Sequence, residues 1–274
     1  MTPEVLEKVH QQMLMIMDDI HRVCLKNNLK YYMIGGTALG AIRHGGFIPW
    51  DPDIDIAMPR EDYDRFLELA PKELDSSLFC HHYKVDKDYY PPHAIVEKKN
   101  TLLRIKNDDI NDALRPQGIY VDVLPLDYVP DDEESQQRQA VDLIKIKKLK
   151  YRKQAKIYSS DSFVKRFVKK IFSLLYAHLS WYQLNEKQES IMKRHNNTSS
   201  RKYICSMASH YTYKKLSMKI EIWGEPKLYS FEGRAYMGPN QIEIYLTNLF
   251  GDYMRLPSKE SQDELLSLYV NAEF

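Results

Sequence analysis

Apolar residues recur at helical spacing over residues 4–26, near the start of the chain. The apolar residues that recur near this spacing are Val5, Val9, Leu14, Met17, Ile20 and Leu25. Pro3 suits the first turn of such a helix, because the amide that proline lacks would be unpaired there. We therefore expect a long amphipathic helix whose apolar face packs on the rest of the protein.

Between residues 31 and 130, short apolar runs predict strands separated by short helices. The clearest strand is Asp53–Met58, in which acidic and apolar residues alternate. Pro59 and Pro125 are expected to end the strands that they follow. This order predicts an α+β or mixed α/β fold, with a mixed sheet flanked by helices. Strands are expected at 31–34, 53–58, 79–85, 94–98, 102–106 and 118–124, and helices at 37–43 and 60–69.

From residue 131 the pattern becomes helical and rich in lysine. The chain is thus expected to comprise a core at 1–130, a basic helical region at 131–200 and a strand-helix region at 201–274 that completes the core. The expected elements are helices at 133–158 and 163–194 with a serine-rich break between them, strands and loops at 202–238, and a last helix at 240–250.

The composition is that of a soluble globular protein, with 43% hydrophobic and 28% charged residues among 274. Cys24, Cys80 and Cys205 are too few and too scattered for a disulfide framework or a zinc cluster, so a reducing, cytoplasmic compartment is expected. The longest apolar stretch falls well short of the roughly 20 residues that a membrane span needs. A membrane-spanning protein is therefore not expected.

The near-neutral net charge of +1 conceals an uneven distribution. Asp and Glu predominate in residues 1–135, and Lys and Arg predominate in the remainder. The segment Lys145–Lys170 alone holds eleven Lys or Arg residues and a single Asp. An acidic half suited to a metal ion and a basic half suited to an anionic surface are expected.

Asp53 and Asp55 share one face of their predicted strand, because successive side chains of a strand point to opposite faces. Their Cα atoms are then about 6.6 Å apart, close enough for both carboxylates to converge on one cation. Mg²⁺ or Mn²⁺ suits such hard oxygen ligands. An isolated pair of this kind is also common on solvated strand faces, so the motif needs further support.

Gly35-Gly36-Thr37 supplies that support at a predicted strand-to-helix turn. Glycines allow close approach of a phosphate, and the first amides of a helix attract anions. Glycines also serve ordinary turns, so this motif too is weak alone. A phosphate-binding turn followed by an acidic strand is, however, what metal-assisted phosphoryl or nucleotidyl transfer requires.

Asp122 is the candidate third carboxylate of such a site, where it would activate or orient an attacking hydroxyl. It lies between Val121 and Val123 on an otherwise apolar strand, where an unpaired charge is costly to bury. It is therefore expected to face a cation or a basic partner. A simple salt bridge or an edge-strand position is the alternative.

These residues closely resemble the LicD family, which has a nucleotidyltransferase-type fold and includes bacterial phosphocholine transferases and eukaryotic fukutin-related proteins. The resemblance covers most of 30–130 and about 230–257. It rests on Gly36-Thr-Ala-Leu-Gly-Ala-Ile-Arg-His-Gly-Gly-Phe-Ile-Pro-Trp-Asp51, Asp53-Ile-Asp55, Arg60-Glu-Asp-Tyr-Asp64, Val121-Asp-Val-Leu-Pro-Leu-Asp127 and Tyr245-Leu…Phe250-Gly-Asp-Tyr-Met-Arg-Leu-Pro257.

The resemblance implies transfer of choline phosphate, ribitol phosphate or glycerol phosphate from a CDP-activated donor to a hydroxyl of a glycan acceptor, such as a lipid-linked surface polysaccharide or teichoic acid. By analogy, Mg²⁺ or Mn²⁺ is the cofactor. The implied catalytic and metal-binding residues are Asp53, Asp55 and Asp122, and the implied nucleotide- and phosphate-binding residues are Gly35, Gly36, Thr37, Arg43 and His44.

Pro52 departs from the family pattern, which usually has three consecutive aspartates after the tryptophan. Strand parity places residue 52 opposite Asp53 and Asp55, so Pro52 is expected to replace a residue that is not a metal ligand. Pro52 leaves open the alternative that the protein is a degenerate relative, which binds glycan or membrane without catalysis. A sugar-nucleotide glycosyltransferase that uses Asp53-Ile54-Asp55 as its metal motif is the other alternative.

Within the basic segment 145–175, a candidate for contact with an anionic membrane surface, residues 163–175 alternate apolar pairs with basic pairs at helical spacing. This pattern is typical of a helix on an anionic membrane surface, here the inner membrane face, and also of a helix packed on its own protein. Nucleic acid is not an expected partner, because the acidic half would repel its phosphates.

Overall fold

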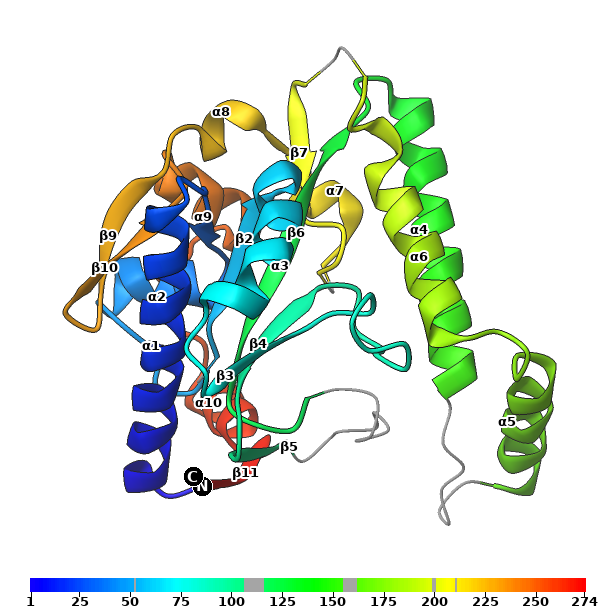
Figure 1. Ribbon diagram of the computed structural model, residues 1–274, viewed down its shortest axis with the longest axis horizontal. Helices are drawn as coiled ribbons and strands as arrows, with labels where there is room; N and C mark the ends of the chain where they lie inside the picture. The colour runs from blue at the N-terminus through cyan, green and yellow to red at the C-terminus, as the bar shows by residue number, and fades with distance from the viewer. Residues whose placement is uncertain (52, 106–115, 155–161, 199–200, 210) are drawn as a thin grey trace.

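The computed structural model describes residues 1–51, 53–105, 116–154, 162–198, 201–209 and 211–274. The chain forms a mixed sheet flanked by helices, which confirms the predicted fold class (Figure 1). The helices are α1 (Pro3–Lys26), α2 (Gly35–Arg43), α3 (Arg60–Glu73), α4 (Glu133–Gln154), α5 (Phe163–Leu175), α6 (Trp181–Met192), α7 (Tyr213–Leu216), α8 (Ile220–Trp223), α9 (Ile242–Phe250) and α10 (Lys259–Leu266).

The strands of the central sheet run in the order β1-β2-β6-β4-β3, and β6 also pairs with β7, which pairs with β8. Strands β2 and β6 are parallel, whereas the other pairs are antiparallel. Two further two-stranded sheets are formed by β9 with β10 and by β5 with β11. The strands are β1 (Tyr32–Met33), β2 (Asp55–Pro59), β3 (Leu78–His81), β4 (Ala94–Lys98), β5 (Leu102–Ile105), β6 (Tyr120–Val129), β7 (Tyr203–Cys205), β8 (Met218–Lys219), β9 (Lys227–Phe231), β10 (Arg234–Gly238) and β11 (Tyr269–Glu273).

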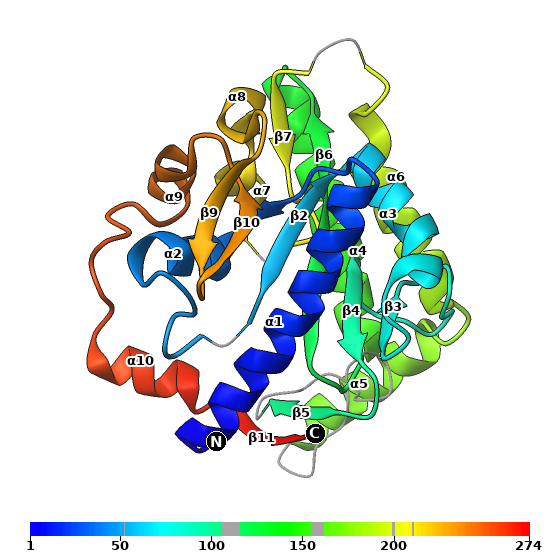
Figure 2. The ribbon, with the colours of Figure 1, turned by 60° about the vertical axis from the view of Figure 1, so that its left-hand side comes forward.

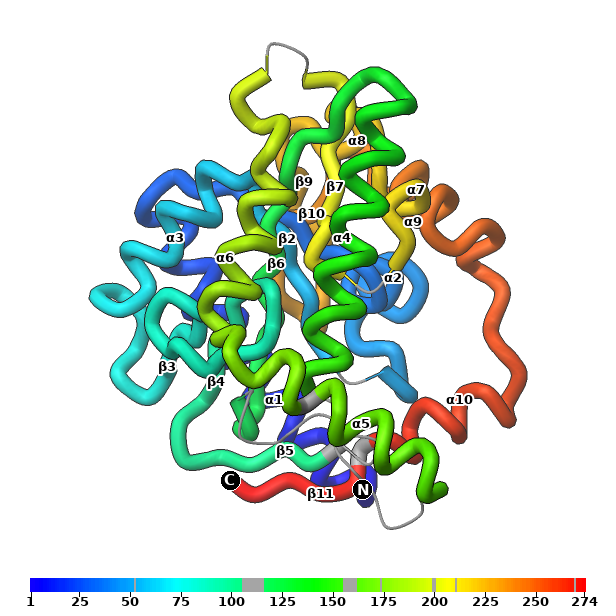
Figure 3. The backbone as a smooth tube through the Cα atoms, turned by 90° about the vertical axis from the view of Figure 1, so that its right-hand side faces the viewer, coloured from blue at the N-terminus to red at the C-terminus, as the bar shows by residue number. Residues whose placement is uncertain are grey.

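Helices cover both sides of this sheet. Figures 2 and 3 show α1 and α3 on one side and the paired helices α4 and α6 on the other. The predicted N-terminal helix is confirmed: the Thr2 hydroxyl caps α1, and its apolar face, including Val9 and Met13, is fully buried. This burial holds the sheet against α1 and fixes the strands that carry the site.

Strand β6 is longer than expected, because Pro125 does not end it. Strand β4 pairs with β6 only up to Val123, and β7 pairs with it only from Asp127 onward. Pro125 therefore lies in the gap between two neighbours on that side, where its missing amide hydrogen breaks no strand pairing. On its other side, β6 is paired with β2 from Asp122 to Leu126.

The single helix predicted at 163–194 is wrong, because α5 and α6 are separate. Ser180 begins α6 with a reciprocal capping box with Gln183, which marks a helix start inside the apolar periodicity. Helix α10 and strand β11 were not expected, and Pro71 lies inside α3, which continues to Glu73. Residues 106 and 155–158 of two predicted elements lie outside the described residues.

A buried ion pair joins helix α3 to strand β6. Arg60, at the start of α3, donates from Nε and Nη2 to the two carboxylate oxygens of Asp127 on β6, at 2.7 and 2.6 Å. Asn196, which follows α6, donates to the same carboxylate at 2.7 Å. This cluster ties the helical region to the sheet. Among the described residues, none of the helices has the length and apolar character required to cross a bilayer.

Candidate active site

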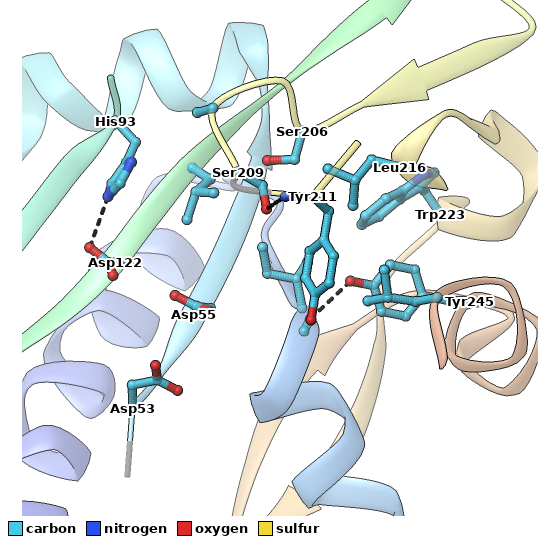
Figure 4. Close-up of a pocket in the computed structure, with 15 residues that line it drawn as sticks. Asp53, Asp55, His93, Asp122, Ser206, Ser209, Tyr211, Leu216, Trp223 and Tyr245 are labelled. Atoms are coloured by element: carbon cyan, nitrogen blue, oxygen red, sulfur yellow. Dashed lines mark hydrogen bonds and ion pairs between the residues drawn. The ribbon is translucent and has the colours of Figure 1, made fainter. Parts of the chain in front are cut away.

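Two carboxylates lie side by side where the parallel strands β2 and β6 begin. Asp55 and Asp122 are direct partners in the register of the two strands, and Asp53 precedes Asp55 by two residues. Figure 4 shows all three along one wall of a cavity. The three predicted catalytic residues are therefore brought together by the fold, as the alternation and the apolar strand around Asp122 indicated.

Asp122 has the basic partner that its apolar strand predicted. His93 Nε2 lies 2.9 Å from Asp122 Oδ1, and the pair lines the cavity (Figure 4). His93 Nδ1 is buried without a hydrogen-bond partner among the described residues. The imidazole thus fixes one oxygen of Asp122.

The carboxylates repel one another in a poorly solvated site. Burial raises the pKa of Asp53 well above its usual range, and the charges of Asp51, Asp55 and Asp122 raise it further. Burial and the charges of Asp122 and Asp51 do the same for the pKa of Asp55. Burial also raises the pKa of Asp51. Such a cluster is expensive at neutral pH unless a cation neutralises it.

The glycine turn packs directly on this cluster. A Cβ atom at Gly36 would lie 2.5 Å from Asp51 Oδ2, so no larger residue fits without moving that carboxylate. Gly35 has a φ of 53°, in the left-handed region that favours glycine, and a Cβ there would lie 3.5 Å from Asp55 Oδ2. Gly36 is therefore required by the close approach of Asp51, and Gly35 by its backbone conformation.

Two polar contacts hold the turn. The Gly35 amide donates to the buried Tyr245 hydroxyl at 2.9 Å, and Thr37 Oγ1 accepts from the Asp55 amide at 2.8 Å. Thr37 is buried and links α2 to β2. Its oxygen already has this backbone partner, and the contact of Thr37 with a phosphate stays a prediction.

Two cavities adjoin at Asp53 and Asp55, which line both. The smaller, of about 270 Å³, is lined by Asp122, His93 and the aromatic residues Tyr211, Trp223 and Tyr245. The larger, of about 710 Å³, extends past the glycine turn to α10 and is lined by Arg43, Trp50, Asp51, Tyr253, Arg255 and Ser258. The acidic wall formed by Asp53, Asp55 and Asp122 thus faces two cavities that differ in size and in lining residues.

Arg43 and His44 occupy different positions at the edge of the site. The Arg43 guanidinium lines the larger cavity, donates to the Tyr253 carbonyl at 2.9 Å and lies 5.9 Å from the centre of the Trp50 ring. His44 packs edge-on against Trp50, with ring centres 5.7 Å apart. Arg43 can therefore face a ligand in the cavity, whereas contact of His44 with a nucleotide stays a prediction.

Several residues of the site were missed by reasoning from the sequence. Asp51 and Tyr245 fall inside the motifs that carried the family resemblance, which offered a signal for both. The sequence carries no such signal for His93 and Tyr211, because only the tertiary fold brings them to the carboxylates. The charges of Asp51, Asp55 and Asp53 contribute to the raised pKa of Tyr211, after burial, which places its hydroxyl near the acidic wall.

The donor chemistry of this wall suits a divalent cation. Asp53, Asp55 and Asp122 supply hard oxygens, and burial together with the neighbouring carboxylates raises the pKa of Asp53 and Asp55. Among the described residues, no group of three or more such side chains converges closely enough to enclose a metal ion. The carboxylates would therefore hold a cation together with water or substrate oxygens, as Mg²⁺ is commonly held.

Comparison with known proteins agrees with this geometry. Residues 28–152 match the LicD/FKTN/FKRP nucleotidyltransferase domain. The chain is 28% identical over 257 residues to the lipopolysaccharide cholinephosphotransferase LicD of Haemophilus influenzae. The matched region covers 90% of each of the two chains.

Shorter matches reach two other kinds of protein. The ribitol 5-phosphate transferase FKRP of Homo sapiens is 42% identical over 48 residues, 18% of this chain and 10% of FKRP. An uncharacterised protein of Rickettsia typhi is 41% identical over 68 residues, 25% of this chain and 22% of that protein. Residues 28–152 thus form a nucleotidyltransferase domain of the LicD/FKTN/FKRP family, and the chain as a whole is similar to a LicD cholinephosphotransferase.

Proposed function

We propose that this protein transfers choline phosphate from CDP-choline to a hydroxyl group of a bacterial surface glycan. The observation that carries the proposal is the acidic wall of Asp53, Asp55 and Asp122 at the junction of two cavities. The names of the H. influenzae and FKRP relatives, which act on choline phosphate and ribitol 5-phosphate, support transfer of a phosphorylated alcohol.

The larger cavity is the proposed site of the cytidine nucleotide. Its volume of about 710 Å³ lies within the usual range for ligand pockets. Arg43 and the aromatic ring of Trp50 line it, and they can meet a phosphate and a base respectively. The diphosphate would then lie beside Asp53 and Asp55, where the two cavities adjoin.

The smaller cavity is the proposed site of the transferred alcohol. Tyr211, Trp223 and Tyr245 line it, and the Trp223 and Tyr245 rings meet edge to face with centres 5.2 Å apart. Aromatic faces bind quaternary ammonium groups, which favours choline over an uncharged polyol. The volume of about 270 Å³ suits a group of this size better than a nucleotide.

In the proposed reaction, the acceptor hydroxyl attacks the phosphorus atom that carries choline. The new P–O bond forms as the bond to CMP breaks, and CMP leaves into the larger cavity. Asp122, oriented by His93 at 2.9 Å, is placed to accept the hydroxyl proton. A divalent cation bound by Asp53 and Asp55 would neutralise charge that develops on the phosphate oxygens.

Donor binding can be tested without knowledge of the acceptor. The purified protein would be melted with CDP-choline, CDP-glycerol, CDP-ribitol, UDP-glucose or GDP-mannose, each with EDTA, Mg²⁺ or Mn²⁺. A ligand at a hundred times its dissociation constant stabilises the fold by about 2.7 kcal/mol, a shift of a few degrees. CDP-choline should give the largest metal-dependent shift, and Asp53→Asn should lose it.

One variant and the series of nucleotides separate the alternatives. Trp223→Leu should weaken the response to CDP-choline more than the response to CDP-ribitol, because only choline depends on the aromatic faces. A larger response to UDP-glucose or GDP-mannose would indicate a glycosyltransferase instead. No response to any nucleotide would favour a non-catalytic relative.

A further inference from the structure

Helix α5 presents an apolar surface to solvent. Four of its apolar residues are largely exposed: Phe163 is 83%, Val164 69%, Phe167 57% and Leu174 70% exposed. Removal of such side chains from water is favourable, so a folded protein seldom leaves so many together in water. The surface requires a partner or an environment that covers it.

The polar residues of α5 are sharply segregated from this surface. At 3.6 residues per turn, the eight apolar residues of Phe163–Leu175 fall within about half of the helix circumference. Lys165, Arg166, Lys169 and Lys170 fall on the other half, and the helix contains no acidic residue. A wide apolar face flanked by cations is the pattern of a helix that lies in a membrane interface.

The position of α5 leaves this face accessible. It packs on α4, and the Arg152 guanidinium of α4 lies 5.1 Å from the centre of the Phe172 ring. In Figures 1 and 3, α5 stands apart from the sheet, at the same end of the molecule as α10. Helix α10 also carries Leu265, which lines the larger cavity.

We propose that α5 docks this protein on an anionic lipid bilayer. The apolar half would enter the boundary between headgroups and acyl chains, and the four basic side chains would reach the lipid phosphates. An anionic bilayer is favoured over a second copy of the chain as the partner of α5. Two α5 helices packed face to face would bring their cationic flanks together, and like charges repel. The proposal is independent of the donor and of the reaction.

Vesicle co-sedimentation of the full chain tests the proposal. Wild-type protein should bind vesicles with about 30 mol% phosphatidylglycerol at least tenfold more tightly than vesicles of phosphatidylcholine alone. Phe163→Ser combined with Phe167→Ser should remove most of this binding. Replacement of Lys165, Lys169 and Lys170 by Gln should remove the preference for anionic lipid. Leu228→Ser is the matched control, since Leu228 is 61% exposed on β9, far from α5 in the sequence.

Circular dichroism and thermal melts would establish that each variant folds. Failure of the wild-type chain to bind phosphatidylglycerol vesicles at low salt would overturn the proposal, as would equal binding by the double serine variant. Concentration-dependent dimerisation, lost in that variant and unaccompanied by vesicle binding, would overturn it in favour of a second copy. CDP-choline binding is measured separately, so the two proposals fail independently.

Discussion

Asp55 and Asp122 stand opposite each other in the parallel register of β2 and β6, which places two acidic side chains on neighbouring strands at one depth of the sheet. Hydrogen bonding between the strands fixes this proximity, so side-chain rotation gives limited relief of the repulsion. The site therefore stores unfavourable electrostatic energy until a cation or a proton arrives.

Asp55→Asn should abolish activity and stabilise the fold. Burial and the charges of Asp122 and Asp51 raise the pKa of Asp55, so the folded state disfavours its charged form at neutral pH. In EDTA at pH 7.5, a gain of ~1 kcal/mol corresponds to about 2–4 °C in melting temperature. CMP release should fall by at least about a hundredfold.

The matched control is Asp88→Asn, at an exposed acid outside the two cavities, which should change neither quantity. Mg²⁺ should stabilise the wild-type protein more than Asp55→Asn. A lower melting temperature for Asp55→Asn in EDTA would contradict the electrostatic account.

Gly36→Ala should damage the site through Asp51. The added methyl group would lie 2.5 Å from Asp51 Oδ2 and would displace that carboxylate. The loss of donor binding should be much smaller when Asp51 is already alanine, because the clash is then absent. A double-mutant cycle on donor-induced thermal stabilisation measures this coupling. Additive effects of the two substitutions would show that the clash is not the cause.

His93→Gln should slow transfer while donor binding persists. His93 contacts Asp122 and orients its carboxylate, and loss of such a partner commonly costs about 10–100-fold in activity. The shift induced by CDP-choline should stay close to the wild-type value. His81→Gln, which removes a similar contact with Glu97 at 2.6 Å, is the control. Equal loss of rate in both variants would indicate general destabilisation.

Lys150 should make the stability of the protein depend on pH. It is 3% exposed between Asn185 and Gln188, and burial, followed by the charge of Lys147, lowers its pKa to about 7. Between pH 7 and about 10.4, the unfolded chain keeps a proton that the folded chain has lost. The contribution of Lys150 to the free energy of unfolding should therefore rise with pH across this window.

Urea unfolding of wild-type protein and Lys150→Met at pH 6.5, 8 and 9.5 measures this effect. The difference in unfolding free energy should move in favour of the wild type as the pH rises. Differences that stay constant would mean that the folded and unfolded pKa values of Lys150 are the same.

The acidic part of the site could be predicted from the sequence because it is local. The alternation around Asp53 and Asp55 and the apolar neighbours of Asp122 each encode a strand face within a few residues. His93 and Tyr211 could not be predicted in this way. Each depends on which segments the sheet brings to the start of β6, a property that no short window contains.

The errors in the fold have similar causes. A proline ends a strand only where the sheet would need the amide hydrogen that proline lacks. At Pro125 the gap between β4 and β7 removes that need, and this gap exists only in the assembled sheet. The break between α5 and α6 was signalled by Ser180 and Gln183, but continuous apolar periodicity outweighed that signal. Local signals thus predicted element types well and the extents of the elements less well.

The cluster of Arg60, Asp127 and Asn196 has a consequence for how the molecule opens. It anchors one end of the α4–α6 pair to the sheet, and Gln139 of α4 donates to the Ile191 carbonyl at 2.7 Å nearby. The opposite end of the pair carries α5, whose apolar face is exposed. Amide protons of α4 near Gln139 should exchange only when the sheet itself unfolds, while those near Lys153 exchange through local fraying. The two ends of one helix would then belong to different cooperative units.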